Sequence, residues 1–183
     1  MDRAQALAAV KSNVTNVNTV KHMLAVEAVM RGLARRLGQD EVSWGMAGLL
    51  HDIDLEVVNA DMETHSRVSA DMARKLGASE EVCQAILVHN ERHGIPRQTP
   101  FEKALWCADP VTGLVTAVAL VMPDKKLASV QVSSISKRFK QLRFAAGANR
   151  DQIASCSELG LELEEFLSLG LEAMKGAAGE LGL

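Results

Sequence analysis

Six side chains in this sequence are imidazoles and carboxylates, the two groups that most often bind transition metals. They comprise three single histidines, one adjacent His-Asp pair and one single aspartate: His22, His51, Asp52, His65, His89 and Asp109. Imidazole and carboxylate together suit Fe, Mn, Zn or Co. The chain contains 5 histidines, so all but one of them belong to this set.

The set as a whole favours a metal site over ordinary core residues, for an energetic reason. A single histidine on an apolar helix face is more often a hydrogen-bonded core residue than a ligand. Carboxylates and imidazoles buried together without partners, however, would cost several kcal/mol per ion. Metal ions would neutralise them directly, and we therefore expect a pair of divalent cations.

The elements that must position these side chains are helices. Apolar residues recur with a period of about 3.6, and no segment alternates apolar and polar residues as a strand would. We therefore predict an all-α fold. The expected helices run from Asn18 to Leu37 with Gly38 as cap, from Glu41 to Ile53, from His65 to Gly77, from Ser79 to His89, and from the capping box Thr99-Pro100-Phe101-Glu102 to Pro123, with a kink at Pro110.

Helical phase places the six side chains on faces that also carry apolar residues, so they should point inward. The shared faces are His22 with Val26, Val29 and Leu33, His65 with Val68, Met72 and Leu76, His89 with Ala85 and Val82, and Asp109 with Leu105 and Thr112. The second helix should turn Val42, Met46, Leu49 and Leu50 inward. Gly45, Ala47 and Gly48 are small enough to let helices approach closely beside His51, and ordinary helix packing explains them equally well.

Composition excludes several classes of protein. The 183 residues are 48% hydrophobic and 23% charged, which is typical of a globular chain. Aromatic residues make up only 3% and tyrosine is absent, so stacking platforms for single-stranded nucleic acid are not expected. Three separated cysteines without a CxxC pair fit a reduced cytoplasm. The N-terminus lacks a signal-peptide pattern, and the apolar run Val111–Met122 is short for a membrane span.

The chain should divide into a metal-binding helical core, residues 1–123, and a helical extension packed on it, residues 124–183. The segment Lys125–Arg150 holds seven lysines and arginines and no acid. It could attract a phosphate-bearing substrate or nucleic acid, but pairing with the acidic segment Asp151–Leu183 is the favoured interpretation. That acidic segment should form two helices separated near Gly160.

A family resemblance accompanies these patterns. The string WGMAGLLHDID, with His22 before it and ALWCADP after it, resembles the HD domain superfamily of helical, metal-dependent phosphohydrolases. Through HNERHG, ADPVTGLVTAVALVMPDKKL, SISKRFK and LGLELEEFLSLGLEAM, nearly the whole chain is similar to a small branch of predicted HD hydrolases. The resemblance implies an HD-type helical bundle with a C-terminal helical extension.

The resemblance also implies a ligand set. In the superfamily, a first metal is held by the equivalents of His22, His51, Asp52 and Asp109. Members with two metals add two histidines, matched here by His65 and His89, and use the doublet aspartate, Asp52, as the bridge. His51 and Asp52 are then the catalytic pair, and a hydroxide that bridges the metals would attack phosphorus.

The sequence departs from the family pattern in the residues after the doublet. Many relatives read HDIGK, whereas Asp54 and Leu55 stand at the Gly and Lys positions, so the usual phosphate-binding lysine is missing. Glu56 is an imperfect substitute for a carboxylate that some nucleotidases carry. HNER resembles the HHE stretch of cyclic-di-GMP phosphodiesterases with Asn90 in place of a histidine, but no GYP follows His93-Gly94, so that substrate is not expected.

Three charged residues are candidates for substrate contact: Glu91, Arg92 and Lys103. A solvated surface charge explains each of them at least as well. Arg67 is a weaker candidate, and His93 should be a loop residue.

The leading hypothesis is a cytoplasmic, metal-dependent hydrolase of a phosphate ester, either a nucleotide or a phosphorylated small metabolite. A di-iron oxygenase of the same superfamily and a non-catalytic nucleotide-binding signalling module are the alternatives. The expected partner is a small phosphorylated molecule, with neither nucleic acid nor membrane. The oligomeric state stays open, with a homodimer as one option.

Overall fold

The computed structural model describes residues 1–183 and contains helices and no strands. This confirms the all-α prediction. The α-helices are α1 Arg3–Asn13, α2 Val17–Leu37, α3 Glu41–Leu50, α4 Arg67–Lys75, α5 Glu80–Val88, α6 Pro100–Leu120, α7 Val132–Phe139, α8 Arg150–Ala154, α9 Leu163–Gly176 and α10 Ala178–Leu181. Short 3₁₀ helices cover Glu91–His93, Leu127–Ser129 and Ser155–Leu159.

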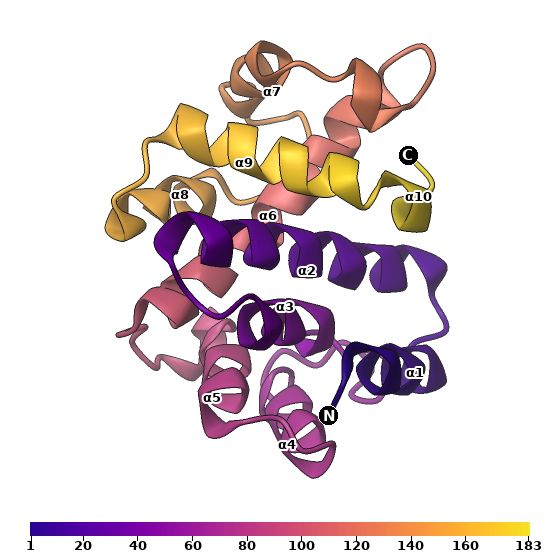
Figure 1. Cartoon of the computed structure of the whole chain (residues 1–183), viewed down its shortest axis with the longest axis vertical. Helices are drawn as coiled ribbons and strands as arrows, with labels where there is room; N and C mark the ends of the chain where they lie inside the picture. Colours follow the sequence, from indigo (N-terminus) through magenta and orange to yellow (C-terminus); the bar gives the residue numbers. More distant parts are fainter.

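The long helices α2 and α6 form the centre of the molecule. α2 lies between α3 on one side and α9 on the other, and α6 crosses behind it (Figure 1). The hydrophobic core is one continuous cluster that includes residues from α1 through α10. The proposed division at residue 123 is not tested by this packing and stays a prediction.

Helix boundaries follow the capping signals. Gly38 ends α2 in the left-handed conformation, Ser79 caps α5, and Thr99 and Glu102 form the expected capping box at the start of α6. Gly160 separates the C-terminal helices as expected. Pro110 leaves the carbonyl of Trp106 without its helical donor, and the side chain of Gln152 donates to that carbonyl at 2.7 Å.

Several expectations about helices were wrong. The third helix begins at Arg67 rather than His65, because Ser66 has a φ of 68° that interrupts a helix. The buried face of α4 consequently carries Ser69, Ala70 and Ala73, while Leu76 of the expected face is exposed. The second helix ends at Leu50, and Val42 in its first turn is 58% exposed instead of facing the core. The sequence analysis also missed α1.

The predicted pairing of the basic segment with the acidic C-terminal segment was wrong as well. None of the ion pairs in the structure involves a residue of 125–150. Three C-terminal acids pair with cations earlier in the chain, Glu158 with Lys103, Glu165 with Arg36 and Glu180 with Arg3, and Glu172 pairs with Lys175 of the same helix. The two segments do pack together, because α7 and the 3₁₀ helix Leu127–Ser129 contact α9, but this packing forms no ion pair between them.

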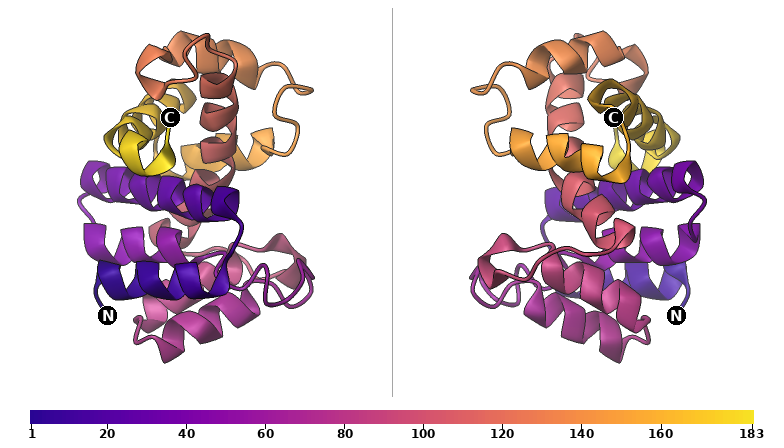
Figure 2. Two further views of the ribbon diagram at one scale, coloured as in Figure 1. Left: turned by 90° about the vertical axis from the view of Figure 1, so that its right-hand side faces the viewer. Right: turned by 90° about the vertical axis from the view of Figure 1, so that its left-hand side faces the viewer.

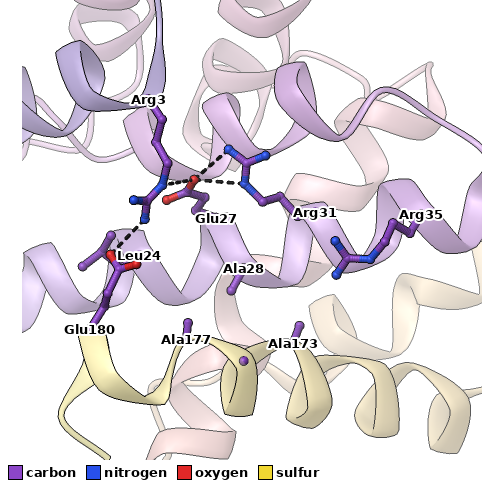
Figure 3. A pocket seen from close by; sticks show the side chains of 10 residues that line it. Arg3, Leu24, Glu27, Ala28, Arg31, Arg35, Ala173, Ala177 and Glu180 are labelled. Carbon is purple, nitrogen blue, oxygen red and sulfur yellow. Dashed lines mark hydrogen bonds and ion pairs between the residues drawn. The ribbon is translucent and has the colours of Figure 1, made fainter.

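A cluster of arginines joins the two ends of the chain to α2. Glu27 of α2 is 3% exposed, and one of its oxygens accepts hydrogen bonds from Arg3 and Arg31 (Figure 3). Arg3 also pairs with Glu180 at 2.9 Å. Each guanidinium is thus matched by a carboxylate, and the cluster fixes α1 and α10 against α2.

α6 is the one helix long and apolar enough to cross a membrane by length and composition. Other elements bury 56% of its most apolar window, as expected for the core helix of a folded domain. The predicted cytoplasmic location is not tested and stays a prediction.

α2 and α3 approach closely at Gly48, as the small residues before His51 suggested. A Cβ atom at Gly48 would lie 2.8 Å from the backbone of Val26 and Glu27. We therefore expect Gly48→Ala to lower the free energy of unfolding by about 3 kcal/mol, because backbone atoms cannot yield cheaply. Gly113 of α6 is the control, since a Cβ there meets nothing within 4 Å. Gly113→Ala should raise stability by up to about 1 kcal/mol, and denaturant unfolding of both variants checks the difference.

Candidate metal centre

The six predicted ligands come from the ends and the middles of helices. His22 and Asp109 lie within α2 and α6, as the periodicity predicted. His51 and Asp52 directly follow α3, and His89 directly follows α5. His65 lies in the turn before α4, which corrects the prediction of a helical position. Turns and helix ends therefore supply four of the six side chains.

One group of side chains surrounds the Oδ2 side of Asp52. The Nε2 atom of His22 lies 3.2 Å from Nε2 of His51 and 3.1 Å from Oδ1 of Asp109. Oδ2 of Asp52 lies 3.6 Å from the His22 nitrogen and 3.4 Å from the His51 nitrogen. The structure thus brings together the four residues that were expected to hold a first metal.

A second group surrounds the other oxygen of the same carboxylate. Oδ1 of Asp52 lies 3.4 Å from Nε2 of His65 and 3.6 Å from Nε2 of His89. Asp52 thus stands between the two groups, with one oxygen turned toward each. This is the arrangement that a bridging carboxylate requires.

Each histidine turns Nε2 toward Asp52 and uses Nδ1 for a separate hydrogen bond. Nδ1 of His51 lies 2.8 Å from the carbonyl of Gly48, and Nδ1 of His89 lies 2.5 Å from the carbonyl of Ile86. Nδ1 of His22 contacts the hydroxyl of Thr112, whose own proton goes to the carbonyl of Asp109. All three contacts require an N–H at Nδ1, which leaves the Nε2 lone pairs free to bind a cation.

Asp54 is the functional residue that the sequence analysis missed. Its carboxylate is fully buried and accepts a hydrogen bond from Nδ1 of His65 at 2.7 Å. The backbone N–H groups of Ser66 and Ser69 donate to its other oxygen. An acid two residues after the doublet was the available signal, but it was judged only as a replacement for glycine. Asp54 instead orients His65 and holds the turn that carries it.

The surroundings of these imidazoles and carboxylates shift their pKa values. Burial lowers the pKa of His51 to about 4, so its imidazole is neutral. Burial alone would raise the pKa of Asp52, but His51 and the other nearby histidines outweigh it and hold the pKa of that carboxyl below its usual value. Burial also opposes charge on His22 and His89, yet Asp109 and Asp52 respectively outweigh it and raise the pKa of each imidazole.

An open pocket of about 310 Å³ exposes the second group to solvent. Its lining includes Asp52, His65, His89 and Asp109, with Leu55, Met62, Asn90, Glu91, Trp106 and Gln152 around them. Of the three candidates for substrate contact, only Glu91 lines it. Arg92 lies outside and is exposed, and Lys103 pairs with Glu158 at 3.2 Å.

The remaining residues singled out in the sequence have structural contacts. Glu56 accepts hydrogen bonds from the backbone of Thr15 and Asn16 and does not line the pocket. His93 lies in a 3₁₀ helix rather than a free loop, with Nε2 at 2.8 Å from the carbonyl of His65. Arg67 donates to Nδ1 of His93. The side chain of Asn90 donates to the carbonyls of Met62 and His65, so Asn90 supports the same turn.

The fold is all-helical, and it gathers four imidazoles and the carboxylate of Asp109 around Asp52, in groups of side chains that could hold metal ions. The family model of the HD domain matches residues 19–120. This chain belongs to the HD domain family, as the resemblance predicted.

Similar curated proteins bear the name Ribonuclease Y. The protein from Oleidesulfovibrio alaskensis is 34% identical over 97 residues, which cover 52% of this chain and 18% of that protein. The protein from Lawsonia intracellularis is 29% identical over 130 residues, which cover 71% of this chain and 23% of that protein. The matched region is therefore less than a quarter of these relatives' length. No solved structure matches the chain significantly.

The role of Asp54 predicts how many cations the chain retains. Asp54→Asn removes the charged acceptor of the His65 N–H, so we expect affinity at the second group to fall by about 10- to 100-fold. At a free metal concentration that saturates both groups of the unmodified chain but lies below the weakened affinity of the variant, elemental analysis should then give one ion per chain instead of two. Asp71→Asn removes an exposed carboxylate of α4 and is the matched control. Two tightly held ions in Asp54→Asn would contradict the assignment.

The raised pKa values of His22 and His89 predict a pH dependence of metal uptake. Each imidazole must lose its proton to bind a cation, so affinity at each group should fall by about tenfold per pH unit below the raised pKa. The stability of the metal-free chain depends on pH in the opposite direction. Protonation of these imidazoles stabilises the fold below the ordinary pKa of 6.5, and this contribution is lost as the pH rises through the raised values.

The rise in Tm on adding metal should therefore be larger at about pH 8 than at about pH 6. Differential scanning fluorimetry with and without metal at the two pH values measures it. A metal-induced shift that is equal or smaller at the higher pH would show that these imidazoles do not release protons to the metal.

Proposed function

We propose that this chain hydrolyses a phosphoric ester bond with two divalent cations bound by His22, His51, Asp52, His65, His89 and Asp109. The observation that carries the proposal is the position of Asp52, whose two oxygens face two separate groups of imidazoles. The substrate class proposed is a nucleotide or a phosphorylated small metabolite. Hydrolysis is favoured over the di-iron oxygenase because the relatives are named as ribonucleases, and RNA is cleaved at phosphodiester bonds.

The donor set fits divalent transition metals. The Nε2 atoms of four histidines converge with two carboxylates, and no lysine or arginine pairs with Asp52 or Asp109. The buried carboxylate of Asp52 and the half-buried carboxylate of Asp109 need another source of positive charge. When bound, a metal pair would supply Lewis-acid polarisation of the phosphoryl oxygens and activation of water at neutral pH.

Residues of this chain orient the four imidazoles and line the pocket beside them. The carbonyls of Gly48 and Ile86, the Thr112 hydroxyl and the Asp54 carboxylate fix the ring orientation of the four imidazoles. Apolar side chains of Leu55, Met62 and Trp106 line the open pocket. Asn90, Glu91 and Gln152 provide polar groups on the same lining.

Reconstitution with Mn, Fe, Co or Zn tests the proposal. The loaded chain should hydrolyse members of a panel of phosphomonoesters and phosphodiesters. Because metal activation supplies several kcal/mol, His51→Ala and Asp52→Ala should each reduce the rate by at least about a thousandfold. Asp71→Asn changes an exposed residue that is not one of the six ligands, so it should leave the rate unchanged. Activity that survives in His51→Ala or Asp52→Ala would refute the proposal.

Two further measurements distinguish the alternatives. A di-iron oxygenase would retain stoichiometric iron after anaerobic purification and consume O₂, whereas the proposed hydrolase consumes none. A signalling module would bind a nucleotide without turnover under every metal condition. The predictions of no nucleic-acid partner and of a homodimer as one option are not tested and stay predictions.

A further inference from the structure

The segment that connects α7 to α8 forms one wall of a second pocket at the metal centre. Residues 140–149 stand off from the helices as a loop (Figure 2). Ala145, Gly147 and Ala148 of this loop line a pocket of about 290 Å³ together with His22 and Asp109. The family model ends at residue 120, so the loop adds to the centre from outside the matched region.

Arg150 holds this loop in shape. Its guanidinium donates to the carbonyls of Phe139 at 3.0 Å, Phe144 at 2.5 Å and Ala145 at 3.1 Å, and also to that of Ala148. No carboxylate pairs with Arg150, so its positive charge is not neutralised within the chain. Ala145 has a φ of 46°, a conformation that a non-glycine residue adopts only when its surroundings enforce it. The loop is therefore built around an uncompensated cation.

Two further cations of the loop have no polar partner. Lys140 and Arg143 are exposed and form neither a hydrogen bond nor an ion pair. Arg143 is two residues from Ala145, so its backbone lies within about 7 Å of the pocket lining. Arg138, by contrast, bonds Gln141 and stacks over Phe144. Lys140 and Arg143 are therefore unpaired cations on the loop whose other residues line the pocket.

The basic loop lies on one side of the centre only. No lysine or arginine lines either pocket, and no residue of the loop lines the open pocket beside His65 and His89. The pocket beside His22 is bordered by the loop, within a segment from Lys125 to Arg150 that contains no acid. An anionic group next to the centre would be attracted toward the loop.

We propose that this loop, through Lys140, Arg143 and the charge of Arg150, is a second anion site that binds a phosphate group of the substrate other than the one that reacts. The inference rests on the proposed function for the reacting phosphate only. It adds a substrate requirement: the substrate carries at least two phosphate groups, either as a diphosphate or as neighbouring phosphates of a short strand.

Binding, rather than activity, tests the inference. The probes are α,β-methylene-ADP, which carries two phosphates, AMP, which carries one, and the 5′-phosphorylated dinucleotide pApA. Isothermal titration calorimetry on the full chain, as purified and after chelation, gives their affinities. Lys140→Gln/Arg143→Gln should weaken α,β-methylene-ADP by about tenfold or more at moderate salt and AMP by less than about threefold. If pApA shows the same loss, the second phosphate can belong to a strand; if it does not, it belongs to a diphosphate.

Two matched variants separate a local site from general attraction. Lys125→Gln/Lys126→Gln removes the same charge from exposed positions of the same basic segment. Lys21→Gln removes the one lysine that lines a third pocket beside His22. Both should leave the affinity for α,β-methylene-ADP within about twofold. An equal loss in either control, equal loss for AMP, or no binding by the unmodified chain would overturn the inference, even if the chain hydrolyses phosphate esters.

Arg150→Lys tests the positioning role without changing the charge. A lysine cannot donate to all these carbonyls, so trypsin should cleave after Lys140 and Arg143 faster than in the unmodified chain, with weaker binding of α,β-methylene-ADP. Thermal unfolding checks that the variant remains folded. Unchanged cleavage and unchanged binding in folded Arg150→Lys would overturn the role of Arg150.

Discussion

The buried carboxylate of Asp52 is the constraint on which the rest of the centre depends. It is 8% exposed and contacts four imidazoles, and no arginine or lysine neutralises it. Its histidine neighbours can neutralise it only when protonated, and burial keeps His51 neutral. A cation on either side of the carboxylate satisfies both requirements at once. The surrounding fold has to keep each Nε2 lone pair turned toward this one side chain.

Helix ends accomplish this orientation for two of the ligands. The last carbonyls of a helix have no intrahelical donor, and those of Gly48 in α3 and Ile86 in α5 lie three residues before His51 and His89. Each carbonyl accepts the Nδ1–H of the histidine that follows its helix. The free polar group at the helix end and the free N–H of the imidazole therefore satisfy each other, and the tautomer that binds metal is fixed by backbone geometry. The close contact of Gly48 with α2 then brings His51 next to His22.

The sequence predicted what periodicity and capping control. His22 and Asp109 were placed correctly because a long amphipathic helix defines which face is buried, and α5 and α6 began at their capping residues. It misplaced His65 because the left-handed backbone of Ser66 is enforced by contacts from Asp54, Asn90 and His93, which lie elsewhere in the chain. The role of Asp54 likewise depends on contacts between distant parts of the chain. Its role exists only once residues 54, 65 and 69 meet in space, and a comparison with a glycine motif gives no sign of it.

The chain beyond the family match also supports the centre, through Pro110. The proline follows Asp109 and leaves the carbonyl of Trp106 unbonded one turn earlier, at the side of α6 that borders the open pocket. Gln152 of α8 satisfies that carbonyl and itself lines the pocket, so α8 is fixed to α6 beside a ligand. Arg150, two residues earlier, shapes the loop that reaches His22 and Asp109. Residues of α8 outside the matched domain thus contact the helix that carries Asp109 and the loop that lines the second pocket.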